Sequence, residues 1–310
     1  IQHGVAGLSW TQPGPGAHVA RAALSFLHYQ AEPGSSCPLT MTHAAVPVLQ
    51  QVPALREWAD KAAAPYYDAR CVSITHKQGI TLGMGMTEKQ GGSDVRTNTT
   101  RAVPHGSGPW GEAFLLTGHK WFFSAPMCDG HLVLARTDER GVTCFFVPRW
   151  RPDGSKNAIH IQRLKDKVGN RSNSSSEVEF KDAWGVLVGE EGRGISTIIE
   201  MATFTRLDCA LASAGYMRQA FAQALHYTRN RHAFGKALVE QPVMTALLEA
   251  RPLVASPEMA MRLADAVSAD QVWPAREFFP AQREELRQRP ARFGHPADNL
   301  HPNIHEGPGG

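Results

Sequence analysis

A glycine-rich segment, residues 85–95, carries the residue types in this chain that are best suited to binding a ligand. It follows a run of alternating apolar residues, 80–86, which predicts a half-buried strand. The segment offers backbone N–H groups and the hydroxyls of Thr87 and Ser93, and such donors suit an electron-rich ring edge or a phosphate. The same residues could instead form an ordinary glycine-rich turn.

A second segment, residues 118–124, places the adjacent aromatic residues Trp121, Phe122 and Phe123 before the hydroxyl of Ser124. Aromatic residues in succession are usual in a strand that is buried on both faces. They can also form a wall for a flat heteroaromatic ring, with Ser124 as a hydrogen-bond donor. Taken together, the two segments favour a binding site over a plain turn.

These segments resemble those of the acyl-CoA dehydrogenase flavoproteins, and most of all the AidB alkylation-response branch of that family, over roughly residues 19–250. One such signature would be weak evidence, but several stand here in the family's order. They are MGMTEKQGGSDVRTNTTRA (84–102), GHKWFFS (118–124), RLKDKVGNRSNSSSEVEF (163–180), GEEGRGI (189–195), TRLDCALAS (205–213) and RHAFGKALVEQPVM (231–244). The fourth is not a dinucleotide-binding fingerprint, because no preceding strand and spacing fit that pattern.

The resemblance implies an FAD-dependent enzyme that takes an α-proton from an acyl thioester while the β-hydride moves to flavin N5. By motif position, Thr87 would donate toward the pyrimidine edge of the flavin, Phe122 would cover its face and Ser124 would lie near N5. Arg231 would reach the flavin diphosphate of a neighbouring subunit, as guanidinium groups bind phosphate well. The residues implied to bind the cofactor are Met86, Thr87, Ser93, Phe122, Ser124, Arg231, Phe234, Gly235 and Gln241.

Each of these residues also has a purely structural interpretation. Thr87 and Ser93 could cap a turn, Phe122 could lie in the core, and Arg231 could sit on a solvated helix face with Glu240. Taken singly, Arg231 and Ser93 favour that interpretation. Taken as an ordered set, the residues favour a flavin site.

The resemblance also implies substrate contacts and a catalytic base. Ser93 and Arg206 are the implied substrate contacts; Arg206 and Asp208 match a family pattern, and a buried Arg–Asp pair is also a common structural feature. The family's base is a glutamate in a late segment of the form E-G-x-G, and Glu306 in EGPG is the candidate here. Few residues separate it from the RHAFG motif, so a flexible acidic tail is the alternative.

Composition excludes few classes of function. The chain has 310 residues, 42% of them hydrophobic, and a net charge of +3, which neither demands nor excludes nucleic acid. The five cysteines show no C-x-x-C spacing, so we expect no metal site and no disulfide framework, but free thiols in a reducing compartment, the cytoplasm. No apolar run is long enough to span a membrane, and we find no signal peptide.

Hydrophobic periodicity predicts an α+β protein with the three-part plan of the acyl-CoA dehydrogenases. Residues 1–78 read as a partial helical domain, and residues 79–187 as a central, mainly antiparallel β-barrel domain. Residues 188–250 read as part of a C-terminal helical bundle that is incomplete here. Within them, an apolar face at residues 195–202 and a second apolar run at 207–225 indicate helix.

Prolines recur through residues 251–310, and apolar periodicity is poor there. We therefore expect a disordered tail, which a truncation or a frame shift would explain. Because the chain begins at Ile1 and not at Met, we expect that residues precede it in the natural protein.

Three functions stay open at this stage. The first is an acyl-CoA dehydrogenase-like enzyme that acts on an acyl-CoA as a homo-oligomer, a tetramer by resemblance. The second is a DNA-associated alkylation-response flavoprotein, although the basic C-terminal region to which the AidB branch owes DNA binding is missing here. The third is an inactive fragment of either.

Overall fold

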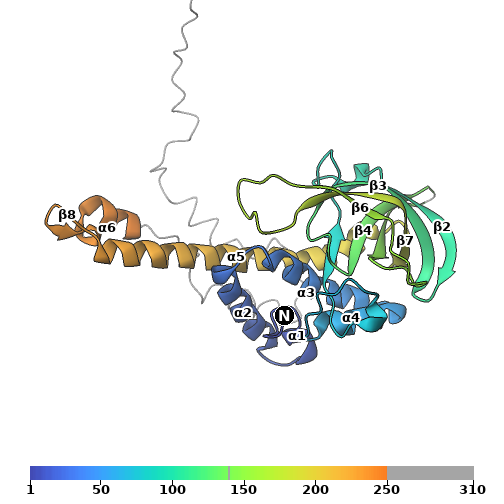
Figure 1. Cartoon of the computed structure of the whole chain (residues 1–310), viewed down its shortest axis with the longest axis horizontal. Coiled ribbons are helices and arrows are strands. Elements are labelled where there is room, and N and C mark those ends of the chain that lie inside the picture. The colour runs from blue at the N-terminus through green and yellow to red at the C-terminus, as the bar shows by residue number, and fades with distance from the viewer. Residues whose placement is uncertain (139, 250–310) are drawn as a thin grey trace, which may run out of the picture. The chain divides into compact units, whose positions relative to one another are not determined.

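A computed structural model of the chain describes residues 1–138 and 140–249 (Figure 1). All of these residues belong to one compact unit, Ile1–Ala269. The expected tail, residues 251–310, lies outside the described residues. Helices flank a β-sheet along the chain, which confirms the α+β class.

The N-terminal helices are arranged around α3 (Ser36–Gln50), which is buried along most of its length. Its sequence is almost free of charge, so it can be enclosed on nearly every side, and Pro38 occupies its first turn, where a missing N–H breaks no helical hydrogen bond. The neighbouring elements are α1 (Leu8–Thr11), α2 (Ala17–Ala31), η1 (Pro53–Leu55), α4 (Arg56–Ala63) and η2 (Ile74–His76).

The strands form a sheet that closes on itself. Going round it, β2 pairs with β3, β3 with β7, β7 with β5, β5 with β4, and β4 with β2. β1 adds to β4 and β6 adds to β7. Of the pairings described, β1–β4 and β2–β4 are parallel and the others antiparallel, as expected for a mainly antiparallel barrel. The strands are β1 (Leu82–Gly85), β2 (Arg101–Gly108), β3 (Gly111–Phe123), β4 (Gly130–Thr137), β5 (Gly141–Pro148), β6 (Ile159–Leu164) and β7 (Ser176–Val188).

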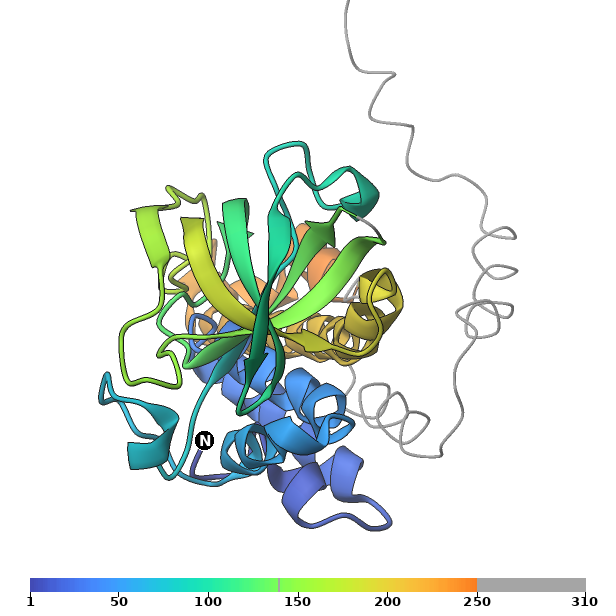
Figure 2. The ribbon, with the colours of Figure 1, turned by 90° about the vertical axis from the view of Figure 1, so that its right-hand side faces the viewer.

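Two buried clusters explain how the barrel carries the helices. One consists of strand residues alone and includes Phe123, Phe145 and Phe180. Alternate residues of the same strands, such as Phe146, point the other way and join a second cluster with helical residues, among them Trp58 of α4. Figure 2 shows the N-terminal helices, in blue, packed below the strands. The barrel and the helices therefore share the second of these clusters.

A single long helix, α5 (Gly194–Asn230), replaces the two apolar segments expected from the sequence. Gly194 lets the helix start directly against β5, because a Cβ there would lie 2.4 Å from the Thr143 carbonyl carbon. The 37 residues of α5 extend over roughly 55 Å at the usual helical rise. Although α5 is long, none of the helices in residues 1–138 and 140–249 is apolar enough over a bilayer's thickness to cross it.

A small hairpin follows α5 at its C-terminal end. It consists of β8 (His232–Ala233) and β9 (Lys236–Ala237), and is followed by η4 (Leu238–Glu240) and α6 (Pro242–Glu249). Figure 1 shows this group at the end of α5 that lies away from the sheet.

Candidate active site

A buried glutamate holds the glycine-rich loop that follows β1. The carboxylate of Glu88 accepts hydrogen bonds from the backbone N–H groups of Thr99 (2.6 Å) and Thr100 (3.1 Å) and from both of their hydroxyls. It also pairs with Nζ of Lys120 on β3, at 2.8 Å. These bonds bring both ends of the loop to one point. The sequence analysis missed Glu88, because a single acid in a polar loop produces no periodic signal.

The Glu88–Lys120 pair is enclosed by protein. Nζ of Lys120 also donates to the carbonyl of Leu134 (2.7 Å), and its side chain is fully buried. Burial lowers the pKa of Lys120 to about 8, against the opposing effect of Glu88. Burial alone would raise the pKa of Glu88, but Lys120 and the threonine hydrogen bonds outweigh it and lower that pKa to about 2. Both groups are therefore charged at neutral pH.

The ends of β1 and β3 bring together the first group of expected flavin residues. Met86 and Thr87 directly follow β1, while Phe122 and Ser124 lie at the end of β3. The N–H of Trp121 donates to the carbonyl of Thr87 at 2.9 Å and joins the two segments. Phe122 is 50% exposed, so it is not a core residue.

The polar groups beside Phe122 fit a flat ring with hydrogen-bonding edges. Within the described residues, the Thr87 hydroxyl has no hydrogen-bond partner. Gly92 lies so close to it that a Cβ would be 2.7 Å from Thr87 Oγ1. The Ser124 hydroxyl interacts with the thiol of Cys37, whose pKa burial raises. An exposed aromatic face with two adjacent hydroxyls is a donor set that suits a flavin.

Ser93 lies further out on the same loop. Its side chain is exposed, just before the turn η3 (Val95–Thr97), which Asp94 caps by accepting from the N–H of Arg96. Ser93 is thus reachable from solvent, as a contact to a phosphate or a substrate would require.

The two residues matched on α5 have different environments. Arg206 is exposed, whereas Asp208 is 1% exposed. The carboxylate of Asp208 pairs with the guanidinium of Arg21 on α2 and accepts a hydrogen bond from the Thr40 hydroxyl of α3 at 2.6 Å. Asp208 therefore joins three helices, and its buried partner is Arg21 and not Arg206.

The second group of expected flavin residues lies on the hairpin after α5. Phe234 and Gly235 form its two-residue turn with φ values of 54° and 77°, as in a type I′ turn. The turn leaves the Phe234 side chain 97% exposed, and Arg231 is exposed at the end of α5. The side chain of Gln241 donates to the Ala233 carbonyl at 3.1 Å and braces the hairpin.

The two groups do not meet in one chain. α5 contacts β5 near its start and carries the hairpin after its end, so that roughly 55 Å of helix separates them. The candidate base, Glu306, lies outside the described residues.

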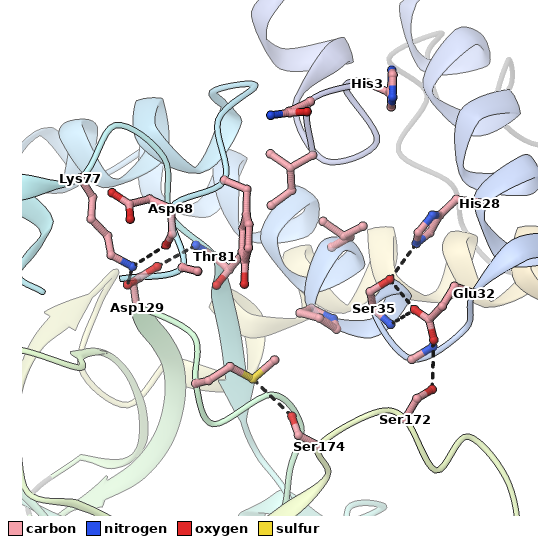
Figure 3. Close-up of a pocket in the computed structure, with 18 of the residues that line it drawn as sticks. His3, His28, Glu32, Ser35, Asp68, Lys77, Thr81, Asp129, Ser172 and Ser174 are labelled. Atoms are coloured by element: carbon pink, nitrogen blue, oxygen red, sulfur yellow. Dashed lines mark hydrogen bonds and ion pairs between the residues drawn. The ribbon is translucent and has the colours of Figure 1, made fainter. Parts of the chain in front are cut away.

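A cavity of about 790 Å³ lies beside the loop that follows Ser124 (Figure 3). On one side, Lys77 pairs with Asp129 at 2.6 Å. On the other, Glu32 accepts from the N–H of Gly34 (2.7 Å) and the hydroxyl of Ser172 (3.0 Å). None of the expected flavin residues lines it, so this cavity is separate from the Thr87–Phe122 surface.

Three protein-family models match the chain. They are the adaptive response protein AidB N-terminal domain over residues 1–69, the acyl-CoA dehydrogenase middle domain over residues 83–183 and the acyl-CoA dehydrogenase C-terminal domain over residues 192–276. The last of these matches extends beyond residue 250.

Individual proteins agree with these domains. The chain is 48% identical to AidB of Escherichia coli (strain K12) over 298 residues, which cover 92% of this chain and 54% of that protein. The structure of Caenorhabditis elegans ACDH-11 in complex with C11-CoA covers 87% of this chain at 27% identity and a TM-score of 0.75, with 47% of that chain covered. A glutaryl-CoA dehydrogenase from Mycobacterium smegmatis in complex with FADH2 has the same fold, with 20% identity and a TM-score of 0.70 over 87% of this chain and 67% of that one.

A shorter match concerns a different class of enzyme. Over 85 residues, 27% of this chain, the sequence is 51% identical to the bifunctional uridylyltransferase/uridylyl-removing enzyme of Xanthomonas campestris pv. campestris (strain B100). That stretch is 10% of the enzyme, so we do not assign the activity of that enzyme to this chain.

The family matches follow the order of the elements along the chain: an AidB-type helical part, the barrel and the helical part that begins with α5. The match to AidB covers most of this chain. The chain spans only about half of AidB, 54% of its length. This chain belongs to the acyl-CoA dehydrogenase family and, through its N-terminal domain, to the AidB branch of that family.

Proposed function

We propose that this chain is the flavin-binding part of an FAD-dependent acyl-CoA dehydrogenase-like oxidoreductase, which desaturates the α–β bond of an acyl-CoA thioester. The observation that carries the proposal is the half-exposed ring of Phe122 beside the hydroxyl of Thr87, which has no hydrogen-bond partner in the described part of the chain. The C11-CoA bound to ACDH-11 supports an acyl-CoA as the substrate class. The FADH2 held by a protein of the same fold supports FAD as the cofactor.

The side chains on the Thr87–Phe122 surface have distinct tasks in this proposal. When bound, FAD supplies the acceptor for the β-hydride. Phe122 covers one ring face and excludes water from it, Thr87 donates to the pyrimidine edge, and Ser124 donates near the hydride-accepting nitrogen. Met86 packs beside the ring, and the backbone N–H groups and the Ser93 hydroxyl face the diphosphate or the acyl-CoA. Arg206, exposed on α5, is the proposed second substrate contact.

A second copy of the chain completes the proposed site. The hairpin lies too far from Phe122 to reach it within one chain, yet it presents Phe234 with almost no cover. Arg231, Gly235 and Gln241 of a second copy would hold the flavin diphosphate, the guanidinium by paired hydrogen bonds to phosphate oxygens. We therefore propose a homo-oligomer, with a tetramer as the family's arrangement.

Removal of the α-proton needs a carboxylate, and Glu306 is the proposed base. Loss of a positioned base slows proton transfer by roughly 10²- to 10⁴-fold. Replacing Glu306 with Gln should therefore slow flavin reduction by substrate by that factor while flavin binding stays unchanged. A Glu306→Gln variant that reduces its flavin at the wild-type rate would rule out this residue.

Flavin retention tests the proposal directly. The chain is mixed with FAD, passed through gel filtration and scanned for visible absorbance. We expect a flavin band that elutes with an oligomer, loss of that band in Phe122→Ala, and its retention in Tyr66→Ala, an exposed aromatic residue away from the site. A wild-type chain that elutes without flavin would refute the proposal and favour the inactive-fragment alternative.

Substrate chemistry is tested next. Anaerobic addition of an acyl-CoA to the flavin-loaded chain should bleach the visible band as the flavin is reduced. A series of acyl chain lengths then identifies the preferred substrate. Retained colour with every acyl-CoA would leave a flavoprotein without dehydrogenase activity.

A second candidate function is a DNA-associated alkylation response. The match of residues 1–69 to the adaptive response protein AidB N-terminal domain supports it. Binding to duplex DNA should then weaken steeply with salt, because phosphate contacts release counterions. Affinity that does not depend on salt would argue against this function.

We place the protein in a reducing compartment, the cytoplasm, because its five cysteines are free.

A further inference from the structure

A lysine ammonium lies against the aromatic pair at the end of β3. Nζ of Lys165 is 3.3 Å from the centroid of the Trp121 ring and 4.8 Å from that of Phe122. A cation within about 6 Å of an aromatic face is attracted by the ring's quadrupole. Two other cations, on Lys89 and Arg163, approach Trp121 only to 5.8 Å.

Glu177 on β7 fixes the ammonium in that position. Nζ of Lys165 lies 2.7 Å from its carboxylate, and the guanidinium of Arg163 lies 2.8 Å from the same oxygen. The Lys165 side chain is only 10% exposed, unlike that of Arg163 at 64%. Lysine side chains normally extend their charge into water, so holding one against two rings is an unusual arrangement.

The backbone is irregular on both sides of Glu177. The β3–β7 pairing shifts register between Lys120 and Phe123, so that Trp121 and Phe122 together lie opposite Glu177. The β6–β7 pairing also shifts, between Ile161 and Arg163. In a regular strand, neighbouring side chains point to opposite faces, and a β-bulge changes that direction. The bulge in β3 explains how Lys165 can contact two consecutive aromatic residues.

We infer that Lys165, held by Glu177, is a positioning residue that orients Trp121 and Phe122 as one aromatic wall and keeps a positive charge behind it. A positive charge at that wall favours a ring that becomes electron-rich. The identity of the ring as a flavin rests on the proposed function, whereas the positioning of the wall does not.

The test compares Lys165→Met, which keeps the aliphatic stem, with Lys165→Arg, which keeps the charge. Lys89→Met is the matched control, because it removes a lysine 5.8 Å from the same ring. We expect Lys165→Met to weaken FAD binding about tenfold. The variant loses the cation–π contact that holds the Trp121 and Phe122 rings in place, and a desolvated contact of this kind contributes on that order. It should also lower the reduction potential of the bound flavin, while Lys165→Arg restores both properties and Lys89→Met, which removes the more distant cation, changes both properties less. Wild-type affinity and potential in Lys165→Met would overturn the inference.

A second measurement needs no flavin and separates this inference from the proposed function. The unfolding of Lys165→Met, Trp121→Leu and the double variant is followed in urea as a double-mutant cycle. We expect a coupling of about threefold to tenfold in the unfolding equilibrium constant. If the wild type binds no FAD but the coupling is present, the proposed function fails and the positioning role stands. Absence of coupling refutes the positioning role.

Discussion

At the scale of single residues, the candidate site depends on side chains that themselves do no chemistry. Glu88 gathers two backbone N–H groups, two hydroxyls and one ammonium on a single carboxylate. Through Lys120 it fixes the loop to β3, so Thr87 lies next to the aromatic wall. Buried carboxylates of this kind are costly unless every oxygen is paired, and here the pairing is extensive.

Glu88→Gln should lower the free energy of unfolding by about 3 kcal/mol at pH 7, because it leaves the Lys120 ammonium buried without its counter-ion. The pKa of Glu88 is lowered from 4.5 to about 2 in the folded chain. Its contribution is therefore fully present above pH 4.5 and is lost as the pH falls from 4.5 toward 2. Urea unfolding of both proteins should show the same difference in the free energy of unfolding at pH 7 and pH 5, and a smaller difference at pH 3.

The control for this experiment is Glu179→Gln. Glu179 pairs with Lys181 at 3.5 Å on the surface, where such pairs contribute little. Two outcomes would contradict the prediction. One is a loss of unfolding free energy in Glu88→Gln that stays constant down to pH 3, and the other is a loss no larger than that in Glu179→Gln.

At the scale of elements, α5 connects the two groups of candidate residues and is itself fixed at one point by charge. Asp208 faces Arg21 and Thr40 in the contact with α2 and α3, while the apolar residue Leu211 packs nearby. The hairpin after α5 has the opposite character, because it exposes an aromatic residue at positive φ. Backbone strain of this kind is often found at functional sites.

Asp208→Asn should destabilise the fold by about 3–5 kcal/mol, since it leaves the buried guanidinium of Arg21 without a negative partner. Chemical denaturation measures the change. Glu200→Gln is the control, because Glu200 lies on the same helix and its carboxylate accepts hydrogen bonds from the exposed side chain of Gln51. A loss below about 1 kcal/mol in Asp208→Asn would show that the pair is not a structural anchor.

Phe234→Asn should leave the stability of the isolated chain unchanged or slightly higher, because Asn tolerates positive φ better than an aromatic residue. Flavin retention and oligomer formation should both weaken, as the exposed ring is lost. Thermal unfolding and gel filtration with FAD measure the two effects. Tyr227→Ala, an exposed aromatic change on α5 itself, serves as the comparison. Full flavin retention in Phe234→Asn would remove the hairpin from the proposed site.

At the scale of the whole molecule, the distribution of candidate residues favours shared sites. The Thr87–Phe122 surface lies at the barrel, and Arg231 lies beyond the full length of α5. A site built from both needs two copies of the chain, each of which supplies a different part. Such an arrangement makes flavin binding dependent on assembly.

Two defective variants should therefore complement each other. The Phe122→Ala and Arg231→Ala chains should each retain no flavin when prepared alone. The two variants are then unfolded, mixed and refolded together. With random pairing into dimers, about a quarter of the sites combine two intact parts, and flavin absorbance should recover to that fraction. Gel filtration in the same run reports assembly. Mixed oligomers without any flavin would contradict a shared site.

The sequence by itself determined the features that depend on neighbours along the chain. The alternating run before residue 86 predicted β1, the order of helix, strand and helix predicted the α+β class, and ordered motifs predicted the family. Hydrophobic periodicity and motif spacing are local properties, so they can be read without the fold. The aromatic run at 121–123 was also recognised, but only the family resemblance, and not the local pattern, distinguished Phe122 from its neighbours.

Tertiary structure alone decided what depends on distant partners. Glu88 meets Lys120 across 32 positions, and Asp208 meets Arg21 across 187, and neither pairing has a local signal. The bulge opposite Glu177 allows Lys120 and Phe123, three positions apart, to be buried together, whereas strict alternation would place them on opposite faces of the strand. The continuity of α5 places the two halves of the candidate site at opposite ends of one helix. Pairing, register and distance arise from chain segments that meet only on folding, which is the physical reason that they required the structure.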